Sequence, residues 1–397
     1  MTLRQRRAEA RAQMRAAQSG SRRSANGTAN GAEAEYERET IVAQELETTL
    51  QPIIDIFCAA LGEALEDEDA LRARVQEVKG ALFAREYAAA FGSVENLEAY
   101  VARWSPARAL AYHDVFTKAN GDKENCVLEA VTKARGDARV LCVGGGAGAE
   151  VVAFAGVLRK IYQSLGLSVG PFDDDEDEDG EEEGEEEEEE GKEDGDKEDK
   201  DTDKNTEKIA GTGPKLVVTA IDIADWSQIV TRLDSTINNL WFPQPDNQPP
   251  RFSVKFLRAD VLALFSTASA PVCKLLAAQQ VVTTMFTINE LFKASRARAM
   301  QFLATLKAGC TTPGALLVFV ESAGSYSDIQ VGSKTFPVQF LIHHTLTAPE
   351  EGGKVAWERV VHSDSQWYRV PETSFATLEY PLKLENMRYF ISVYRRL

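Results

Sequence analysis

The chain has 397 residues and a formal net charge of −18 at pH 7, and a chain of this length can form more than one domain and bury a large core. The acidity is local: residues 173–201 hold 22 acids and three lysines, whereas the first 23 residues hold seven arginines and one acid. A basic arm beside an acidic tract favours interaction with nucleic acid or basic proteins over a simple metabolic enzyme.

The composition also argues against several kinds of site. Five cysteines without CxxC spacing and only four histidines indicate free thiols in a reducing compartment and no metal site. No apolar run approaches the roughly 20 residues of a membrane span, and no apolar segment follows the N-terminal arginines as in a signal peptide. We therefore expect neither a metal nor a membrane partner, and we expect a monomer. A mitochondrial presequence remains an alternative for the arm.

Patterning divides the chain into three regions. Residues 1–32 are basic and then rich in small polar residues, which predicts a disordered arm. Residues 33–134 repeat apolar residues at steps of three and four, which predicts a helical region. Residues 135–397 alternate strand-like and helix-like segments, interrupted by an acidic low-complexity insert at 170–210 that we expect to be disordered.

Start signals place several helices in the N-terminal region. Pro52 should begin a helix or kink one. Ser93 is the expected N-cap of the helix that contains "SVENLEAYVARW". In "SPARALAYHDVFTKA", Ser105 and Pro106 are the expected N-cap and first residue of a further helix.

The rest of the chain predicts an α/β fold with a Rossmann-like, mostly parallel sheet, because strands and helices alternate. The predicted helices are 150–165, 227–242 and 295–310. Residues 387–397 predict an antiparallel C-terminal strand, with a partner strand near 354–363. The other predicted strands are 139–143, 215–222, 252–260, 278–292 (which runs into a loop) and 314–322.

The stretch "RVLCVGGGAGAEVVAF" places four glycines between the first of these strands and its helix: Gly144, Gly145, Gly146 and Gly148. A glycine-rich turn lets the backbone approach a ligand closely, and the following helix offers free N–H groups. The spacing fits a dinucleotide or S-adenosylmethionine, and it also fits a turn that only packs a helix onto a sheet.

Acids end the next two predicted strands: Asp222 suits either cofactor, Asp260 is more typical of S-adenosylmethionine enzymes, and each could instead cap a helix. Asp222 could accept hydrogen bonds from ribose hydroxyls, and Asp260 could accept one from an adenine amino group. Open sheets bind ligands at the carboxyl ends of their strands. The helical region precedes the glycines, whereas hydride-transfer enzymes usually append a substrate domain after them, so chain order also favours methyl transfer. The predicted cofactor contacts are Gly144, Gly145, Gly146, Gly148, Asp222, Ile223, Asp260, Thr287 and Arg108.

Six separated motifs resemble the fungal 25S rRNA uridine-N3 methyltransferase family: "WSPARALAY", "VGGGAGAE", "MFTINELF", "ESAGSYS", "SQWYR" and "YPLKLENMRYFISVYRR". The resemblance implies a class I methyltransferase fold, S-adenosylmethionine as the methyl donor and N3 of a uridine in large-subunit ribosomal RNA as the acceptor. It implies ribosomal RNA or preribosomal particles as partners, in the nucleus and nucleolus and also in the cytoplasm. In one departure, Cys142 stands where many class I enzymes carry an acid, so either Glu150 replaces that contact or the contact is absent.

A uridine N3 must lose its proton before methylation, so a base near the acceptor would help. The candidates are Glu290, in the loop after the fourth strand, and Glu321, after the fifth, with Asn289 as a hydrogen-bonding neighbour. The residues that could stack on or clamp a flipped nucleotide are Tyr326, Trp367, Tyr368 and Arg369.

Other functions stay open on the sequence alone. One is a methyltransferase that acts on protein or a small molecule, and another is a methyltransferase-fold ribosome assembly factor without catalysis. A dinucleotide oxidoreductase is a more distant alternative. The sequence leaves undecided which nucleotide is modified, which acid is the base and whether the substrate is free RNA or a preribosome.

Overall fold

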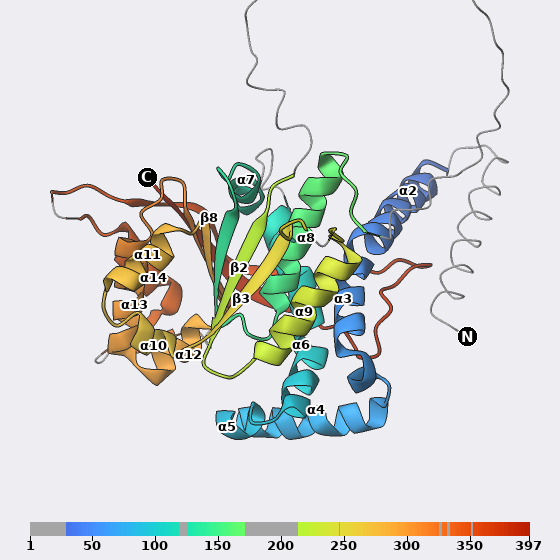
Figure 1. Ribbon diagram of the computed structural model, residues 1–397, viewed down its shortest axis with the longest axis horizontal. Coiled ribbons are helices and arrows are strands. Elements are labelled where there is room, and N and C mark those ends of the chain that lie inside the picture. The colour runs from blue at the N-terminus through green and yellow to red at the C-terminus, as the bar shows by residue number, and fades with distance from the viewer. Residues whose placement is uncertain are drawn as a thin grey trace, which may run out of the picture.

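The computed structural model describes residues 29–118, 125–170, 213–245, 247–324, 328–331, 334–350 and 352–397 (Figure 1). The basic arm up to residue 28, the acidic segment 171–212 and Tyr326 lie outside the described residues, so the expectations for them stay predictions. The described chain forms a seven-stranded sheet with helices on both faces, and a separate two-stranded sheet of β6 (Asp328–Val331) and β7 (Lys334–Pro337) (Figure 1).

The large sheet has the strand order β3-β2-β1-β4-β5-β9-β8. The first five strands are parallel to their neighbours, whereas β9 runs antiparallel to both β5 and β8. This confirms the predicted mostly parallel sheet with an antiparallel C-terminal strand. The strands are β1 (Ala138–Val143), β2 (Leu216–Asp222), β3 (Phe252–Arg258), β4 (Val281–Met285), β5 (Leu316–Ser322), β8 (Trp357–Tyr368) and β9 (Met387–Arg396).

The order of the strands reverses at β1. Its neighbours β2 and β4 lie on opposite sides of it, so the connections that leave the carboxyl ends of β1 and β4 diverge. Open α/β sheets bind ligands in the crevice at such a point. The topology therefore directs attention to the glycine loop after β1 and to the turn after β4.

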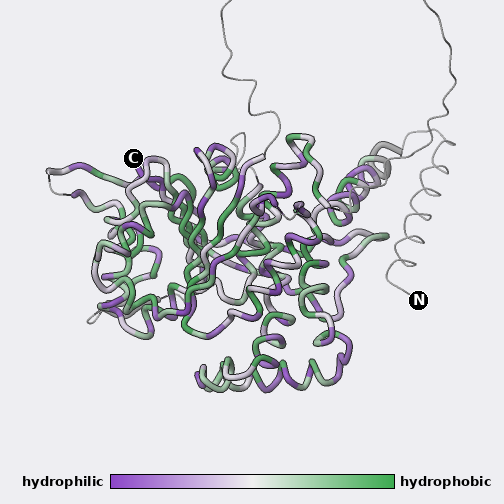
Figure 2. Tube along the Cα trace, viewed as in Figure 1, coloured by the Kyte–Doolittle hydropathy of each residue, from purple (hydrophilic) through white to green (hydrophobic). Residues whose placement is uncertain are grey.

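Alternate residues of β1 enter two buried clusters, one on each face of the sheet. Val140 and Cys142 belong to the first cluster, and Leu141 and Val143 belong to the second. Hydrophobic colour gathers along the central strands, while the outlying helix α4 carries both colours (Figure 2). The first face is covered by α6 (Val94–Thr117), α8 (Ala149–Ser164) and α9 (Ser227–Leu240), and the second by α10 (Val261–Leu264), α11 (Ala270–Ala277), α12 (Ile288–Ala294), α13 (Arg296–Gly309) and α14 (Val338–Thr347).

The N-terminal part is helical, as predicted. Pro52 lies in the first turn of α3 and follows a π-helical turn. The hydroxyl of Ser93 caps α6 by accepting the N–H of Asn96 at 3.2 Å. The elements before and after α6 are α2 (Ala29–Glu45), the π-helix Leu46–Leu50, α3 (Gln51–Leu61), the 3₁₀ turn Gly62–Leu65, α4 (Glu68–Phe83), α5 (Tyr87–Ala90) and α7 (Cys126–Thr132).

The predicted helix start at Ser105 is wrong. Residues Val94–Thr117 form one helix of 24 residues with Pro106 inside it. Ser105 is fully buried, and its hydroxyl donates to the carbonyl of Ala147 at 2.7 Å instead of capping a helix. The hydroxyl therefore ties α6 to the glycine loop.

The segment Ala34–Leu65 is more apolar than the sequence analysis suggested. Its length and composition would by themselves allow it to cross a membrane. The part that forms α3 packs instead against α6, α8 and α9, and it buries Ile53, Ile54, Ile56 and Phe57. This is the pattern of a core helix, in which apolar residues are removed from water by neighbouring helices.

Candidate active site

The glycine loop joins β1 to α8 at the reversal of strand order. Gly144 and Gly148 have φ angles of 78° and 80°, in the left-handed region that glycine adopts without a steric penalty. A Cβ atom at Gly144 would overlap the side chain of Thr287, and one at Gly146 would overlap the ring of Trp226. The loop thus needs glycine for its conformation at two positions and for close approach at Gly144 and Gly146.

A pocket lies over this loop and holds about 500 Å³ of space, including its open mouth. Its walls come from α6, from the carboxyl ends of β2 and β4, and from the residues that follow these strands. Several of the predicted cofactor contacts meet here. The lining residues are Phe91, Tyr100, Arg108, Tyr112, Gly144, Gly145, Ala147, Gly148, Ala149, Glu150, Asp222, Trp226, Met285, Phe286 and Thr287.

Asp222 lies at the end of β2, with its carboxylate against the loop. One oxygen accepts the N–H of Gly146 at 3.3 Å, and the other accepts the N–H of Ala224 at 3.1 Å. Burial raises the pKa of this carboxyl group, although these two bonds oppose the shift. The side chain both fixes the loop and presents acceptor oxygens to the pocket.

Glu150 in the first turn of α8 is the acid beneath the loop. Its side chain is 3% exposed and accepts the hydroxyl of Thr283. A Cβ at Gly145 would lie 3.1 Å from its Oε2 atom and 2.6 Å from the Cβ of Cys142. Burial raises the pKa of Glu150 to about 8. Glu150 thus occupies the space beside Cys142, as expected for a residue that replaces the missing acid.

The buried carboxyl group of Glu150 predicts a stability that depends on pH. The ordinary pKa is 4.5 and the folded pKa is about 8, so the unfolded chain releases this proton first as pH rises. The free energy of unfolding therefore falls between these two values and stays lower above pH 8. Glu150→Gln removes this loss, because glutamine keeps an oxygen for Thr283 without a charge.

We expect the melting temperature of Glu150→Gln, relative to the native chain, to be at least about 4 °C higher at pH 9 than at pH 5, since each pKa unit corresponds to ~1.36 kcal/mol. Calorimetric scans at the two pH values measure this difference. The control is Glu95→Gln, because Glu95 also lies in the first turn of a helix but is exposed. If the melting temperature of Glu150→Gln differed from that of the native chain by the same amount at both pH values, the raised pKa of Glu150 would be contradicted.

Arg108 on α6, one of the predicted cofactor contacts, forms part of the pocket wall. It donates to the hydroxyl of Tyr100 at 2.9 Å, and its guanidinium lies 5.6 Å from the ring centre of Phe286. Phe286 has a φ of 55°, which is uncommon for a residue other than glycine and marks a strained turn. The turn after β4 is thereby held against α6, with Thr287 over the glycine loop.

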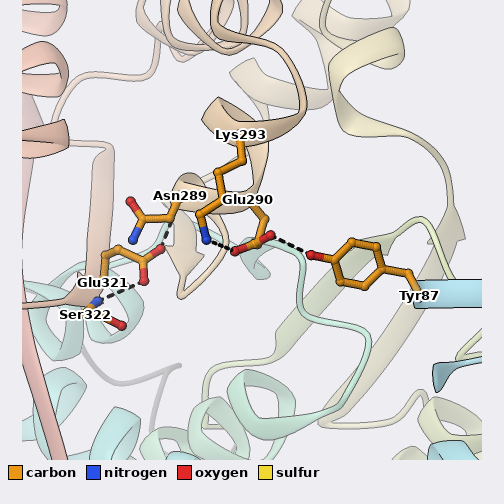
Figure 3. A network of polar contacts seen from close by, with 6 residues as sticks. All are labelled: Tyr87, Asn289, Glu290, Lys293, Glu321 and Ser322. Carbon is orange, nitrogen blue, oxygen red and sulfur yellow. Dashed lines mark hydrogen bonds and ion pairs between the residues drawn. The ribbon is translucent and has the colours of Figure 1, made fainter. Parts of the chain in front are cut away.

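The predicted acids lie near each other, Glu290 on α12 and Glu321 at the end of β5 (Figure 3). Glu321 is 3% exposed and accepts the N–H of Ser322 at 2.9 Å and that of Asn289 at 3.2 Å. Burial raises the pKa of Glu321, although both bonds oppose the shift. The N–H of Asn289 thus joins the turn after β4 to the end of β5.

Glu290 has a different environment. It lies on α12 instead of in a loop, so its predicted place is corrected. The carboxylate accepts the hydroxyl of Tyr87 at 2.8 Å and pairs with Lys293 at 2.6 Å (Figure 3). Burial favours the neutral form, but these bonds outweigh it and lower the pKa of Glu290. The pKa of Glu321 is therefore raised while that of Glu290 is lowered. Such a difference lets two carboxyl groups of one site take different roles.

Some predicted residues lie outside the pocket lining. The strand β3 ends at Arg258, so Asp260 does not end it; Asp260 caps α10 by accepting the N–H of Leu262 at 2.9 Å. Ile223 is 67% exposed beside Asp222. Tyr368 is buried, which removes it from a nucleotide clamp, whereas Trp367 is 54% exposed.

The sequence analysis did not identify Trp226, Tyr100 or Phe91 as parts of the pocket wall. The rings of Tyr100 and Phe91 lie 5.6 Å and 5.4 Å from that of Trp226. In the sequence, the one indication of this aromatic wall is that Trp226 stands four residues after Asp222. Among the described residues, no group of three or more histidine, cysteine or acidic side chains could hold a metal ion.

Comparison with known proteins places this geometry in a family. The family model described as "Putative SAM-dependent methyltransferase" matches residues 57–395. The 25S rRNA (uridine(2843)-N(3))-methyltransferase of Saccharomyces cerevisiae is 32% identical over 354 residues, which cover 87% of this chain and 85% of the yeast protein. The chain therefore belongs to this family of S-adenosylmethionine-dependent methyltransferases.

The chain is also similar to solved structures of low identity. A SAM-dependent methyltransferase from Methanosarcina mazei is 11% identical with a TM-score of 0.32, covering 66% of this chain and 94% of that one. The CMeT domain of the citrinin polyketide synthase is also 11% identical, with a TM-score of 0.35, and covers 83% of this chain and 66% of that domain.

The fold is that of a class I methyltransferase, and the cofactor is S-adenosylmethionine. The residues of the pocket fit this cofactor. Gly144, Gly145 and Gly148 line the pocket without side chains, and Asp222 offers carboxylate oxygens for ribose hydroxyls. When bound, the cofactor supplies a methyl group on a sulfonium centre.

Proposed function

We propose that this protein methylates N3 of a uridine in large-subunit ribosomal RNA. The observation that carries the proposal is the 32% identity to the yeast 25S rRNA uridine-N3 methyltransferase over 87% of the chain. We further propose that it acts as a monomer on ribosomal RNA or preribosomal particles, in the nucleus or nucleolus. The acids beside the cofactor pocket support the chemistry, because an imide nitrogen must lose a proton to become nucleophilic.

We assign the proton-accepting role to Glu321. Its carboxyl group lies at the end of β5, and burial raises its pKa toward the range in which a general base operates near neutral pH. The N–H groups of Ser322 and Asn289 hold it in one orientation. In the proposed step, Glu321 would accept the proton of uridine N3, and the methyl group that the cofactor supplies would bond to N3 as its bond to sulfur breaks.

Glu290 is the weaker candidate for the base, although the sequence analysis proposed both acids. Its carboxylate is stabilised by Lys293 and Tyr87, and a lowered pKa makes it a poorer proton acceptor. Its contact with Tyr87 joins α12 to α5 across 203 positions of the chain. We therefore propose that Glu290 positions α12, and with it the backbone N–H that Asn289 donates to Glu321.

A methylation assay tests the proposed function. Purified protein is incubated with labelled S-adenosylmethionine and with either unmodified large-subunit ribosomal RNA or preribosomal particles, and the RNA is digested to nucleosides for mass spectrometry. We expect labelled 3-methyluridine in the RNA and no label in protein. Label in ribosomal protein alone would support a protein methyltransferase instead. Binding of RNA without any label, by protein that binds the cofactor, would support an assembly factor.

A further inference from the structure

Trp367 is an exposed tryptophan at the edge of the large sheet. All five tryptophans lie within the described ranges, and Trp226, Trp241 and Trp357 are buried, whereas Trp367 is 54% exposed. The guanidinium of Arg369 lies 5.3 Å from its ring centre, and that of Arg388 lies 5.9 Å away. The chain thus holds one large aromatic ring at the surface between two cations.

The local strand geometry fixes this arrangement. β8 is an edge strand, and its register against β9 shifts between Ser363 and Gln366. A bulge of this kind redirects the side chains that follow it, and here it places Trp367 opposite Arg388. The hydroxyl of Ser365 accepts the Nε–H of Arg388 at 3.0 Å. Ser365, which lies in the bulge, therefore holds the guanidinium of Arg388 in place.

Both cations are available to a ligand. Arg369 and Arg388 are exposed, and within the described part of the chain neither forms an ion pair with an acidic side chain. An exposed guanidinium without an acidic partner can bind a phosphate oxygen through its fork of N–H donors. The ring between them remains open to stacking on its exposed part.

Trp367 and Arg388 lie at the same end of the strands as Glu321, the proposed base. In the register, Ser322 next to Glu321 pairs with Tyr389, the residue after Arg388. Trp367 is therefore two strands away from β5, about 10 Å at the usual spacing of roughly 4.8 Å between strands. At a rise of about 3.4 Å per nucleotide, roughly three nucleotides would cover this distance.

We propose that Trp367, Arg369 and Arg388 form a binding surface for single-stranded RNA, on which an unpaired base stacks on the indole ring and the two guanidinium groups bind the adjoining phosphates. An aromatic ring beside arginines is the combination that binds unpaired nucleotides without a fixed sequence. This inference rests on the proposed function for the identity of the RNA, because it names where the substrate is held outside the cofactor pocket.

The test measures RNA affinity without methylation. Fluorescence anisotropy follows the binding of a labelled single-stranded fragment of large-subunit ribosomal RNA to the full chain and its variants at several salt concentrations. We expect Trp367→Ala to weaken binding about 5- to 100-fold, and Trp367→Phe to weaken it less. Arg369→Gln and Arg388→Gln should each reduce the slope of log affinity against log salt by about 0.7.

Matched controls separate this surface from general effects. Phe83→Ala removes another exposed ring, 93% exposed at the end of α4, and should leave RNA affinity unchanged. The affinity for S-adenosylmethionine should be unchanged in every variant. Base stacking should also quench tryptophan fluorescence of the native chain, and this quenching should be absent in Trp367→Phe.

The outcomes distinguish this inference from the proposed function. RNA affinity of Trp367→Ala within twofold of native, with no loss of quenching in Trp367→Phe, overturns the RNA surface even if ribosomal RNA is methylated. Conversely, RNA binding that depends on Trp367 in a protein that methylates no ribosomal RNA supports the surface and rejects the proposed function. Equal losses in Trp367→Ala and Phe83→Ala would also overturn the inference.

Discussion

Replacing Glu321 with glutamine is expected to lower kcat for uridine methylation by about 10²- to 10⁴-fold, the usual contribution of a general base. Glutamine is close in shape and keeps an oxygen for one of the two N–H groups that the carboxylate accepts, but it cannot take up the N3 proton. Single-turnover kinetics with saturating RNA and S-adenosylmethionine measure the effect, and titration calorimetry should show cofactor affinity within about threefold of native.

The pH dependence adds an independent readout. Burial raises the pKa of Glu321 above its ordinary value, so the fraction that is ionised falls as pH decreases, and it does so at a higher pH than for an exposed glutamate. The native rate should therefore decline on the acid side above the ordinary glutamate range, and this limb should disappear in Glu321→Gln.

Glu290→Gln is the matched comparison, because it removes the neighbouring carboxylate while the acid limb of the profile stays. We expect a loss of less than about 10-fold, from the weakened contacts to Tyr87 and Lys293. If instead Glu290→Gln loses the activity and the acid limb while Glu321→Gln keeps both, the two roles are exchanged.

Replacing Asp222 with alanine is expected to weaken S-adenosylmethionine binding by at least about 100-fold. Hydrogen bonds to a charged group each contribute about 1.5–3 kcal/mol, and a loss of ~2.8 kcal/mol corresponds to about 100-fold in Kd. The same carboxylate also accepts the N–H of Gly146, so the loop loses an anchor as well. Titration calorimetry with S-adenosylmethionine and with its demethylated product measures both affinities.

Asp225→Ala is the control for Asp222→Ala. Asp225 lies three residues further along the same turn, but it is exposed and accepts hydrogen bonds from Ser227. We expect cofactor affinity within about twofold of native in this variant. Native affinity in a folded Asp222→Ala protein would show that the pocket does not hold the ribose through this carboxylate.

The order of the elements could be predicted from the sequence because each strand and helix has its own local signal. Apolar runs such as 139–143 alternate with helical patterns, and they predict the mostly parallel sheet with an antiparallel C-terminal strand that is observed, although not the order of its strands. The start of a helix at Ser105 could not be excluded from local signals, since a serine before a proline fits an N-cap equally well. Only the tertiary bond from Ser105 to Ala147 distinguishes the two cases.

The pocket residues could be predicted where a glycine turn or an acidic residue stands at the end of a predicted strand. Gly144 directly follows β1 and Asp222 ends β2, and because these neighbouring strands are parallel the two residues lie at the same end of the sheet. Asp260 was assigned by the same rule, but β3 ends two residues earlier and the side chain caps α10, so its contact with the cofactor stays a prediction. The aromatic wall was missed since Tyr100 and Trp226 meet only through packing over a long sequence separation.

The helix α6 begins in the N-terminal region and ends beside the core of the sheet. Its Ser105 bonds to the glycine loop, and its Arg108 and Tyr112 line the cofactor pocket. Ligand binding stabilises every part of a protein that must be folded to form the site. The helices before the glycines and the sheet after them should therefore melt in a single cooperative transition that S-adenosylmethionine shifts upward as a whole, and a chain shortened to its sheet would lose the ligand together with the helix.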